Sequence, residues 1–141
     1  MLIEFRVDGD LPPKKDGANS MWQKPAEVQR LRLLRTAAAR AMQGRPPLCR
    51  NITLELEIHV GARNSRSTGD LDNLVTGVCD GLMAADPRAI RPDIWGADAG
   101  TAICPSMSIA IEDDSDVVAI SAKKIIGDTT APWYLVRLAR A

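Results

Sequence analysis

The feature that most constrains the fold is a strict two-residue alternation between residues 51 and 60. The apolar side chains share one face of an extended chain: Ile52, Leu54, Leu56, Ile58 and Val60. The polar side chains share the other face: Thr53, Glu55, Glu57 and His59. This pattern is typical of a β-strand that buries one face. The strand therefore has one face for a core and one for solvent.

Three further segments predict strands. Residues 2–8 alternate in the same way, and residues 117–126 form an apolar, strand-like run. The third strand is expected to start either within residues 106–112 or at Val117. Residues 133–138 are expected to form the last strand, at an edge of the sheet.

Two helices are predicted from apolar residues spaced three and four apart. The first begins at Pro25, which suits a first helical turn, and ends near Gly44. The second begins around residues 70–73. Residues 86–106 are expected to be irregular, because prolines and glycines interrupt them. We therefore expect a single α+β domain over residues 1–141, with a small mixed sheet of four or five strands and two helices packed on it.

The composition excludes several classes of protein. Apolar residues make up 45% and charged residues 26%, which is an ordinary globular balance. No stretch approaches the ~18 apolar residues of a membrane span, and residues 1–7 lack the basic and apolar regions of a signal peptide. The three cysteines are widely spaced and form no Cys-x-x-Cys pair. They indicate free thiols, so we expect a cytoplasmic protein with no membrane partner.

The net charge is zero, but its distribution along the chain is uneven. Residues 1–69 hold 12 Lys/Arg and 7 Asp/Glu, whereas residues 70–141 hold 6 and 11. Two interpretations remain open. The charges are scattered over a solvated surface, or a basic surface that meets phosphates lies beside an acidic pocket that holds cations.

Two groups of carboxylates are candidates for chemistry. Asp70 and Asp72 stand at a predicted loop-to-helix junction, and the acidic run 112–116 directly precedes a predicted strand. One interpretation is a helix cap and a solvated turn. The other is a divalent-metal site, because crowded carboxylates repel each other unless a cation neutralises them, and Mg²⁺ binds through a few carboxylates. The first two aspartates can converge only if Asp70 is extended and Asp72 lies in the first helical turn.

Three sequence blocks occur in a recognisable order. They are Asp70-Leu71-Asp72-Asn73-Leu74, Asp80-Gly81-Leu82, and Asp113-Asp114-Ser115-Asp116-Val117-Val118 followed by Lys124. Together they resemble the RusA-type Holliday junction resolvases, which are small homodimeric nucleases of bacteria and their phages. The resemblance covers residues 70–83 and 111–125 well. It covers residues 1–60 only in the order of elements and in the Pro-Pro pair after the first strand.

The resemblance implies a RusA-like homodimer with two active sites. The activity would be a Mg²⁺-dependent, structure-selective endodeoxyribonuclease of DNA recombination and repair, with Mn²⁺ as a possible substitute and branched or duplex DNA as substrate. Asp70 and Asp72 match the first two metal-binding aspartates of the family, Asp114 matches the third, and Asp113 is a near neighbour. Because no Gly-rich nucleotide-binding loop is present, we expect no nucleotide cofactor and rank a nucleotide phosphohydrolase last.

The chain departs from the family in two places. Thr76 stands where the resolvases often have a lysine that is thought to assist at the scissile phosphate. Lys124 or the Lys14–Lys15 pair could substitute for it. Residues at about 86–108 form an insertion that is atypical of the family. The alternative is a non-catalytic or divergent nucleic-acid-binding homodimer that retains the aspartates, and the missing lysine favours it.

Contacts to the DNA backbone are expected from basic side chains near the carboxylates. Arg63 and Arg66 are the strongest candidates, because their loop leads directly into Asp70. The others are Lys14, Lys15, Lys124 and the arginines of the helix at 25–43. Leu33 is expected to be exposed on that helix and is one possible interface residue.

Four ring side chains are not assigned a catalytic role. His59 is expected to be a solvated or hydrogen-bonded strand histidine. Trp22 and Trp133 are expected in the core or at an interface. Trp95 either stacks on a base or packs the insertion against the domain, and the second interpretation is favoured.

Overall fold

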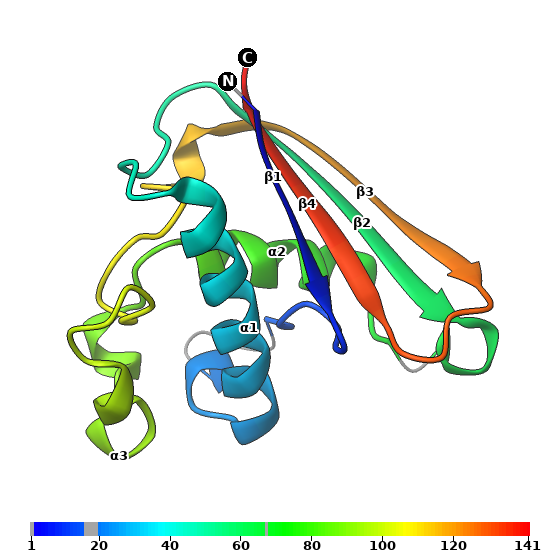
Figure 1. Ribbon diagram of the computed structural model, residues 1–141, viewed down its shortest axis with the longest axis horizontal. Helices are drawn as coiled ribbons and strands as arrows, with labels where there is room; N and C mark the ends of the chain where they lie inside the picture. Colours follow the sequence, from blue (N-terminus) through cyan, green and yellow to red (C-terminus); the bar gives the residue numbers. More distant parts are fainter. Residues whose placement is uncertain (1, 16–19, 67) are drawn as a thin grey trace.

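The computed structural model describes residues 2–15, 20–66 and 68–141. Its strands form one sheet in the order β1-β4-β2-β3 (Figure 1). They are β1 (Leu2–Asp8), β2 (Ile52–Gly61), β3 (Val117–Gly127) and β4 (Trp133–Arg140). β2 and β3 are parallel, whereas β4 is antiparallel to both β1 and β2. The predicted α+β fold with a small mixed sheet is therefore confirmed.

The prediction of an edge position for the last strand is wrong. β4 lies inside the sheet, hydrogen-bonded to β1 on one side and β2 on the other. Alternation reveals how many faces of a strand are covered, and it is silent on how many neighbours the strand has. Residues 106–112 form no regular strand and contribute only an isolated bridge from Ile111 to Leu48, so the third strand begins at Val117.

The two predicted helices are α1 (Pro25–Met42) and α2 (Leu71–Leu82). A third helix, α3 (Pro92–Trp95), forms one turn inside the segment that we expected to be irregular. Short 3-10 turns occur at Ser20–Trp22, Ala62–Asn64, Pro87–Ala89, Gly96–Asp98 and Asp114–Asp116. Among the described residues, no helix is long and apolar enough to cross a membrane.

The core lies between one face of the sheet and the helices α1 and α2. Its strand residues share that face by register, since Leu138 of β4 is the partner of both Ile3 and Leu54. Leu34 of α1 and Leu74 of α2 belong to the same buried cluster. Burial of these apolar side chains is the main force that holds the helices on the sheet.

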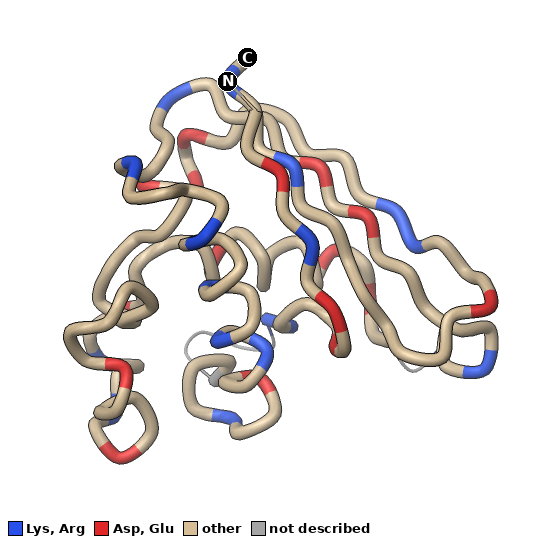
Figure 2. The backbone as a smooth tube through the Cα atoms, viewed as in Figure 1, with Lys and Arg blue, Asp and Glu red and all other residues tan. Residues whose placement is uncertain are grey.

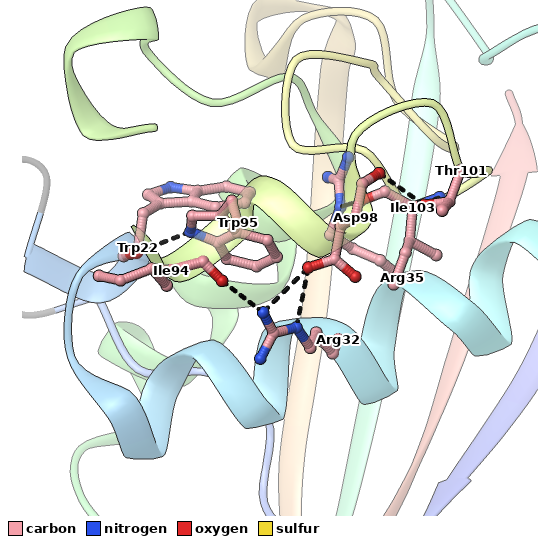
Figure 3. Close-up of polar contacts among 8 residues, drawn as sticks. All are labelled: Trp22, Arg32, Arg35, Ile94, Trp95, Asp98, Thr101 and Ile103. Carbon is pink, nitrogen blue, oxygen red and sulfur yellow. Dashed lines mark hydrogen bonds and ion pairs between the residues drawn. The ribbon is translucent and has the colours of Figure 1, made fainter. Parts of the chain in front are cut away.

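The segment that follows α2 docks against α1 (Figure 3). Trp95 is only 1% exposed, its indole Nε1 donates a hydrogen bond to the Trp22 carbonyl at 2.8 Å, and the two rings lie 5.6 Å apart. Trp95 therefore packs the segment after α2 against the rest of the fold, as the favoured interpretation predicted.

Two arginines of α1 bind this segment, the partly exposed Arg32 and the buried Arg35. Arg32 pairs with Asp98 and donates to the Ile94 carbonyl. Arg35 is fully buried and donates hydrogen bonds to five backbone carbonyls. The expectation that Arg35 contacts DNA is wrong, because its polar partners are internal. Arg40 remains exposed on the helix.

The opposite face of the sheet carries polar side chains and one aromatic stack. His59 stacks on Trp133 with 3.7 Å between ring centroids and hydrogen-bonds Glu57 at 3.1 Å. The guanidinium of Arg6 lies over Trp133 at 3.7 Å. His59 is thus a hydrogen-bonded strand histidine, as expected.

Candidate functional site

The junction before α2 has the backbone geometry that the first two aspartates require. Asp70 is the N-cap residue with extended dihedral angles (φ −74°, ψ 137°), and Asp72 lies in the first helical turn. The Asp70 side chain makes no capping hydrogen bond, although aspartate is a favoured cap. Both side chains are exposed. The simple interpretation of Asp70 as a side-chain cap is therefore wrong.

A further aspartate lies toward the C-terminal end of α2, on the same helical face as Asp72. Residues four apart lie on one helical face, so Asp72, Thr76 and Asp80 form a row. The Thr76 hydroxyl donates to the Asp72 carbonyl at 2.9 Å and is exposed. Asp80 was not among the predicted site residues. The four-residue spacing from Asp72 is the sequence signal that could have identified it.

The second acidic group lies near the C-terminal half of α2. The pKa of Asp114 is raised, first because its carboxyl shares a hydrogen bond with Asp113, and also through burial and the charges of Asp113 and Asp80. The pKa of Asp113 is lowered, chiefly because its carboxylate accepts the Ser115 backbone N–H at 3.0 Å. Burial raises the pKa of the Cys79 thiol to about 11, and Asp80 and Asp114 add to this. Asp114 and Asp80 are therefore electrostatic neighbours.

The predicted ligands do not form one compact cluster. Asp70 and Asp72 lie at the start of α2, and Asp114 lies beside its other half, near Asp80. Within residues 2–15, 20–66 and 68–141, no group of three or more His, Cys, Asp or Glu side chains is placed to hold a metal ion. The arrangement is a line of carboxylates along α2 that ends at Asp114.

Lys15 lies along the same side of α2. Its backbone N–H donates to the Asn73 carbonyl at 3.2 Å, and its ammonium pairs with Asp80 at 2.7 Å. Asn73 and Asp80 are two helical turns apart, and Thr76 lies on the intervening turn. Lys15 therefore crosses the part of the helix where the resemblance expects a lysine.

A glycine makes this approach possible. A Cβ at Gly77 would lie 1.9 Å from the Pro13 carbonyl oxygen, so only a residue without a side chain lets the segment before Lys15 lie against α2. Pro13 itself is buried. The close contact fixes the position of Lys15 relative to the acidic row.

The start of α2 has its own basic neighbours. The Lys124 ammonium on β3 donates to the Gly69 carbonyl at 2.6 Å, and the Lys14 side chain lies against Gly69. Arg63 and Arg66 are exposed on the loop that leads into α2. Outside α1, four of the five predicted DNA-binding residues thus lie on or beside the loop that ends at Asp70, and the fifth, Lys15, contacts Asp80.

The basic first half and the acidic second half of the chain do not form separate basic and acidic regions in the fold. Figure 2 shows Lys and Arg interspersed with Asp and Glu along the strands and helices. Arg137 of β4, for example, lies at 2.7–3.7 Å from Glu4, Glu55 and Glu57 of the two neighbouring strands. The mixture of signs is consistent with the zero net charge.

These features describe a small α+β protein with a four-stranded mixed sheet and a line of carboxylates bordered by lysines. Comparison of the chain with protein-family models and with curated protein sequences found no match.

Proposed function

We propose that the protein is a RusA-like, divalent-metal-dependent endodeoxyribonuclease that acts on branched DNA. The observation that carries the proposal is the line of carboxylates along α2. It begins at Asp70, which makes no capping hydrogen bond, and ends beside Asp114. Hard oxygen ligands of this kind suit Mg²⁺ and Mn²⁺. The pKa of Asp114 is raised first by its hydrogen bond to Asp113, then by burial and by the charges of Asp113 and Asp80, and a cation would offset the repulsion between these charges.

In this proposal the metal ligands are Asp70, Asp72, Asp114 and Asp113. They do not form one cluster in this structure, so a single cation would have to draw the start of α2 and the start of β3 together. When bound, Mg²⁺ polarises phosphoryl oxygen and lowers the pKa of a water molecule. The carboxylates must remain ionised to bind the cation, so the site works above the raised pKa of Asp114. The neighbouring Asp80 adds negative charge that favours cation entry.

Lys15 takes the place of the family lysine in this proposal. Its ammonium lies at Asp80, one helical turn beyond Thr76, and a cation at this position offsets charge on a nearby phosphate. Lys14, Lys124, Arg63 and Arg66 would bind the DNA backbone, which fixes the position of the duplex without reading its sequence. A homodimer would carry two such sites and could cut two strands of one junction.

The test is a cleavage assay with purified protein on a four-way junction, a flap, a duplex and single-stranded DNA. We expect cleavage of branched DNA with Mg²⁺ or Mn²⁺, none with EDTA, and loss of cleavage in Asp70→Asn. Arg88→Ala is the matched control, since Arg88 is exposed and its ion pair is with Asp86, away from the acidic residues of the proposed site. Activity in EDTA, or full activity in Asp70→Asn, would refute the metal site.

The role of Lys15 has a separate test. Lys15→Ala should lower the cleavage rate by ~10–100-fold if the cation lowers the barrier by ~1.4–2.7 kcal/mol. Thr76→Lys should restore much of the rate in that background, because it puts a cation on the same face of α2, one helical turn before Asp80. A Lys15→Ala protein that cleaves normally would show that the missing lysine has no substitute here.

A second candidate is a DNA-binding homodimer without catalytic activity. It is favoured by the absence of a preformed group of three metal ligands among the described residues. This protein would bind branched DNA equally well with Mg²⁺ and with EDTA and would leave every substrate intact.

A further inference from the structure

A cavity of about 240 Å³ lies at one end of the sheet. The end of β1, the end of β2 and the start of β4 meet there, because Asp8, His59 and Trp133 are register partners. α1 and the loop before α2 complete the wall with Arg30 and Thr68. None of the described residues that line the cavity is an aspartate assigned to the metal, so the cavity is separate from the proposed active site.

A network of ion pairs forms the polar side of the cavity. The Arg30 guanidinium donates from Nε to Asp10 Oδ1 at 3.0 Å and from Nη1 to Glu27 Oε1 at 2.7 Å. The Lys14 backbone N–H donates to Glu27 Oε2 at 2.6 Å, so both oxygens of this carboxylate are paired. Asp10 Oδ1 also accepts the Leu11 backbone N–H at 2.7 Å, whereas its Oδ2 accepts no hydrogen bond from the residues that the structure describes. Two carboxylates thus share one guanidinium, which leaves one negative charge in excess.

A buried hydroxyl lies next to this network. Tyr134 of β4 is 0% exposed, and within the described part of the chain its hydroxyl has no hydrogen-bond partner. Burial raises the pKa of Tyr134, the charge of Asp10 adds to this, and the charge of Arg30 opposes it. The hydroxyl is therefore neutral and lies close to the ion pair, on its buried side. Because almost all buried polar groups in folded proteins are paired, this hydroxyl indicates a place for a polar ligand group at the inner end of the cavity.

The chemistry of the wall selects the ligand. An anion is disfavoured, because two carboxylates already border the guanidinium of Arg30. An uncharged apolar molecule would cover Asp10 Oδ2 without giving it a partner, which is unfavourable. A primary ammonium group has a positive charge and three donors, so it can bind Asp10 and Tyr134 together. We propose that the cavity binds a small primary amine as its ammonium ion.

The rest of the wall suits the apolar part of such a molecule. Leu11, Val60 and Pro132 all line the cavity. An apolar cavity of ~150 Å³ can hold benzene, so about 240 Å³ is sufficient for a ring that carries an aminomethyl group. Benzylamine is therefore a suitable probe, and benzyl alcohol and benzoate are its neutral and anionic counterparts.

The first experiment is calorimetric titration of the wild-type chain with the three probes at neutral pH. Benzylamine is protonated under these conditions, and we expect it to bind at least about tenfold more tightly than benzyl alcohol, because only the ammonium pairs with Asp10. Benzoate should not bind. Asp10→Asn keeps the size of the side chain and removes its charge, so it should weaken benzylamine binding at least ~10-fold. Asp8→Asn is the matched control, since Asp8 is exposed, pairs with Arg6 and does not line the cavity.

The second experiment separates a binding role of Tyr134 from a structural one. Tyr134→Phe removes a buried hydroxyl that has no partner among the described residues, so the thermal midpoint of the ligand-free protein should not fall. The same variant should bind benzylamine ~3–10-fold more weakly, because the ammonium loses one acceptor. A general loss of structure would instead lower the midpoint and the affinity together. Circular dichroism verifies that each variant is folded.

The proposal is overturned if benzylamine does not bind at millimolar concentration, if benzyl alcohol binds equally well, or if Asp10→Asn leaves the affinity unchanged. A Tyr134→Phe protein that loses both thermal stability and affinity would overturn the assignment of the hydroxyl as a ligand group. The amine site uses none of the proposed metal ligands and is independent of the nuclease activity. A protein that cleaves branched DNA and does not bind benzylamine would remove the amine site alone, and an inactive protein that binds benzylamine would remove the nuclease proposal alone.

Discussion

Replacement of Arg35 should destabilise the protein far more than replacement of its neighbour Arg32. All five N–H donors of the Arg35 guanidinium are used, at 2.6–3.2 Å, on five backbone carbonyls. These carbonyls belong to Gly81, Met83, Ile103, Cys104 and Met107. Arg35 thus ties α1 to the end of α2 and to the segment 103–107. Burial lowers its pKa to about 10, which reflects the cost of holding this cation without a carboxylate partner.

The magnitude follows from what Arg35→Met leaves behind. Each buried carbonyl that loses its donor costs at least ~1 kcal/mol, and removal of the buried cation returns part of that cost. We expect a loss of about 3–5 kcal/mol from a total unfolding free energy of roughly 5–15 kcal/mol. Arg32→Met removes a partly exposed ion pair with Asp98 and one carbonyl contact, so it should cost only ~1 kcal/mol.

Urea denaturation followed by tryptophan fluorescence measures both variants, since Trp22 and Trp95 lie beside these arginines (Figure 3). Arg35→Lys should fall between Arg35→Met and the wild type, because an ammonium can satisfy at most three of the five carbonyls. If Arg35→Met and Arg32→Met lose equal stability, the buried guanidinium does not organise the segment 103–107 and the reasoning is refuted.

Three further predictions concern α2 and its surroundings. Mg²⁺ should raise the thermal midpoint of unfolding, because it binds the folded state. Asp114→Asn should abolish this rise and should also raise the midpoint measured without metal, because it removes a disfavoured charge. A normal Mg²⁺ response of Asp114→Asn would contradict the proposed site. The pKa of the Cys79 thiol is raised from 9.0 to about 11 in the folded protein. The free energy of unfolding should therefore be highest below pH 9 and should fall as the pH rises through 11. In urea denaturation repeated at several pH values, Cys79→Ala should flatten this fall. Gly77→Ala should displace the Pro13 backbone and lower the rate of junction cleavage. Gly81→Ala should be milder, because a Cβ there meets leucine methyl groups and the Pro13 ring. Equal effects would show that the close approach of the Pro13 carbonyl to Gly77 is unimportant.

Local periodicity was sufficient to predict most elements of the fold. Alternation over residues 52–60 and the three- and four-residue spacing after Pro25 each reflect one buried face, which is a property of the local chain. The same holds for the start of α2, where Asp70 is extended and Asp72 helical as the metal-site hypothesis required. The acidic pattern itself was visible without any tertiary contact.

The order of the strands could not be read from the same patterns. β4 alternates as β1 and β2 do, yet it lies between them, because hydrogen-bonding partners are selected by contacts across the whole sheet. Arg35 has the same chemistry as Arg40 on the same helix. It is buried only because the distant segment 103–107 brings carbonyls to it.

The candidate site divides in the same way. The sequence alone determined which carboxylates and lysines are present and that Asp72 and Thr76 share a helical face. Only the tertiary structure decided that Asp80 is the neighbour of Asp114 and that Lys15 reaches it across Gly77. Both contacts join segments far apart in the chain, and their energies depend on how the core positions α2 between the first loop and the start of β3.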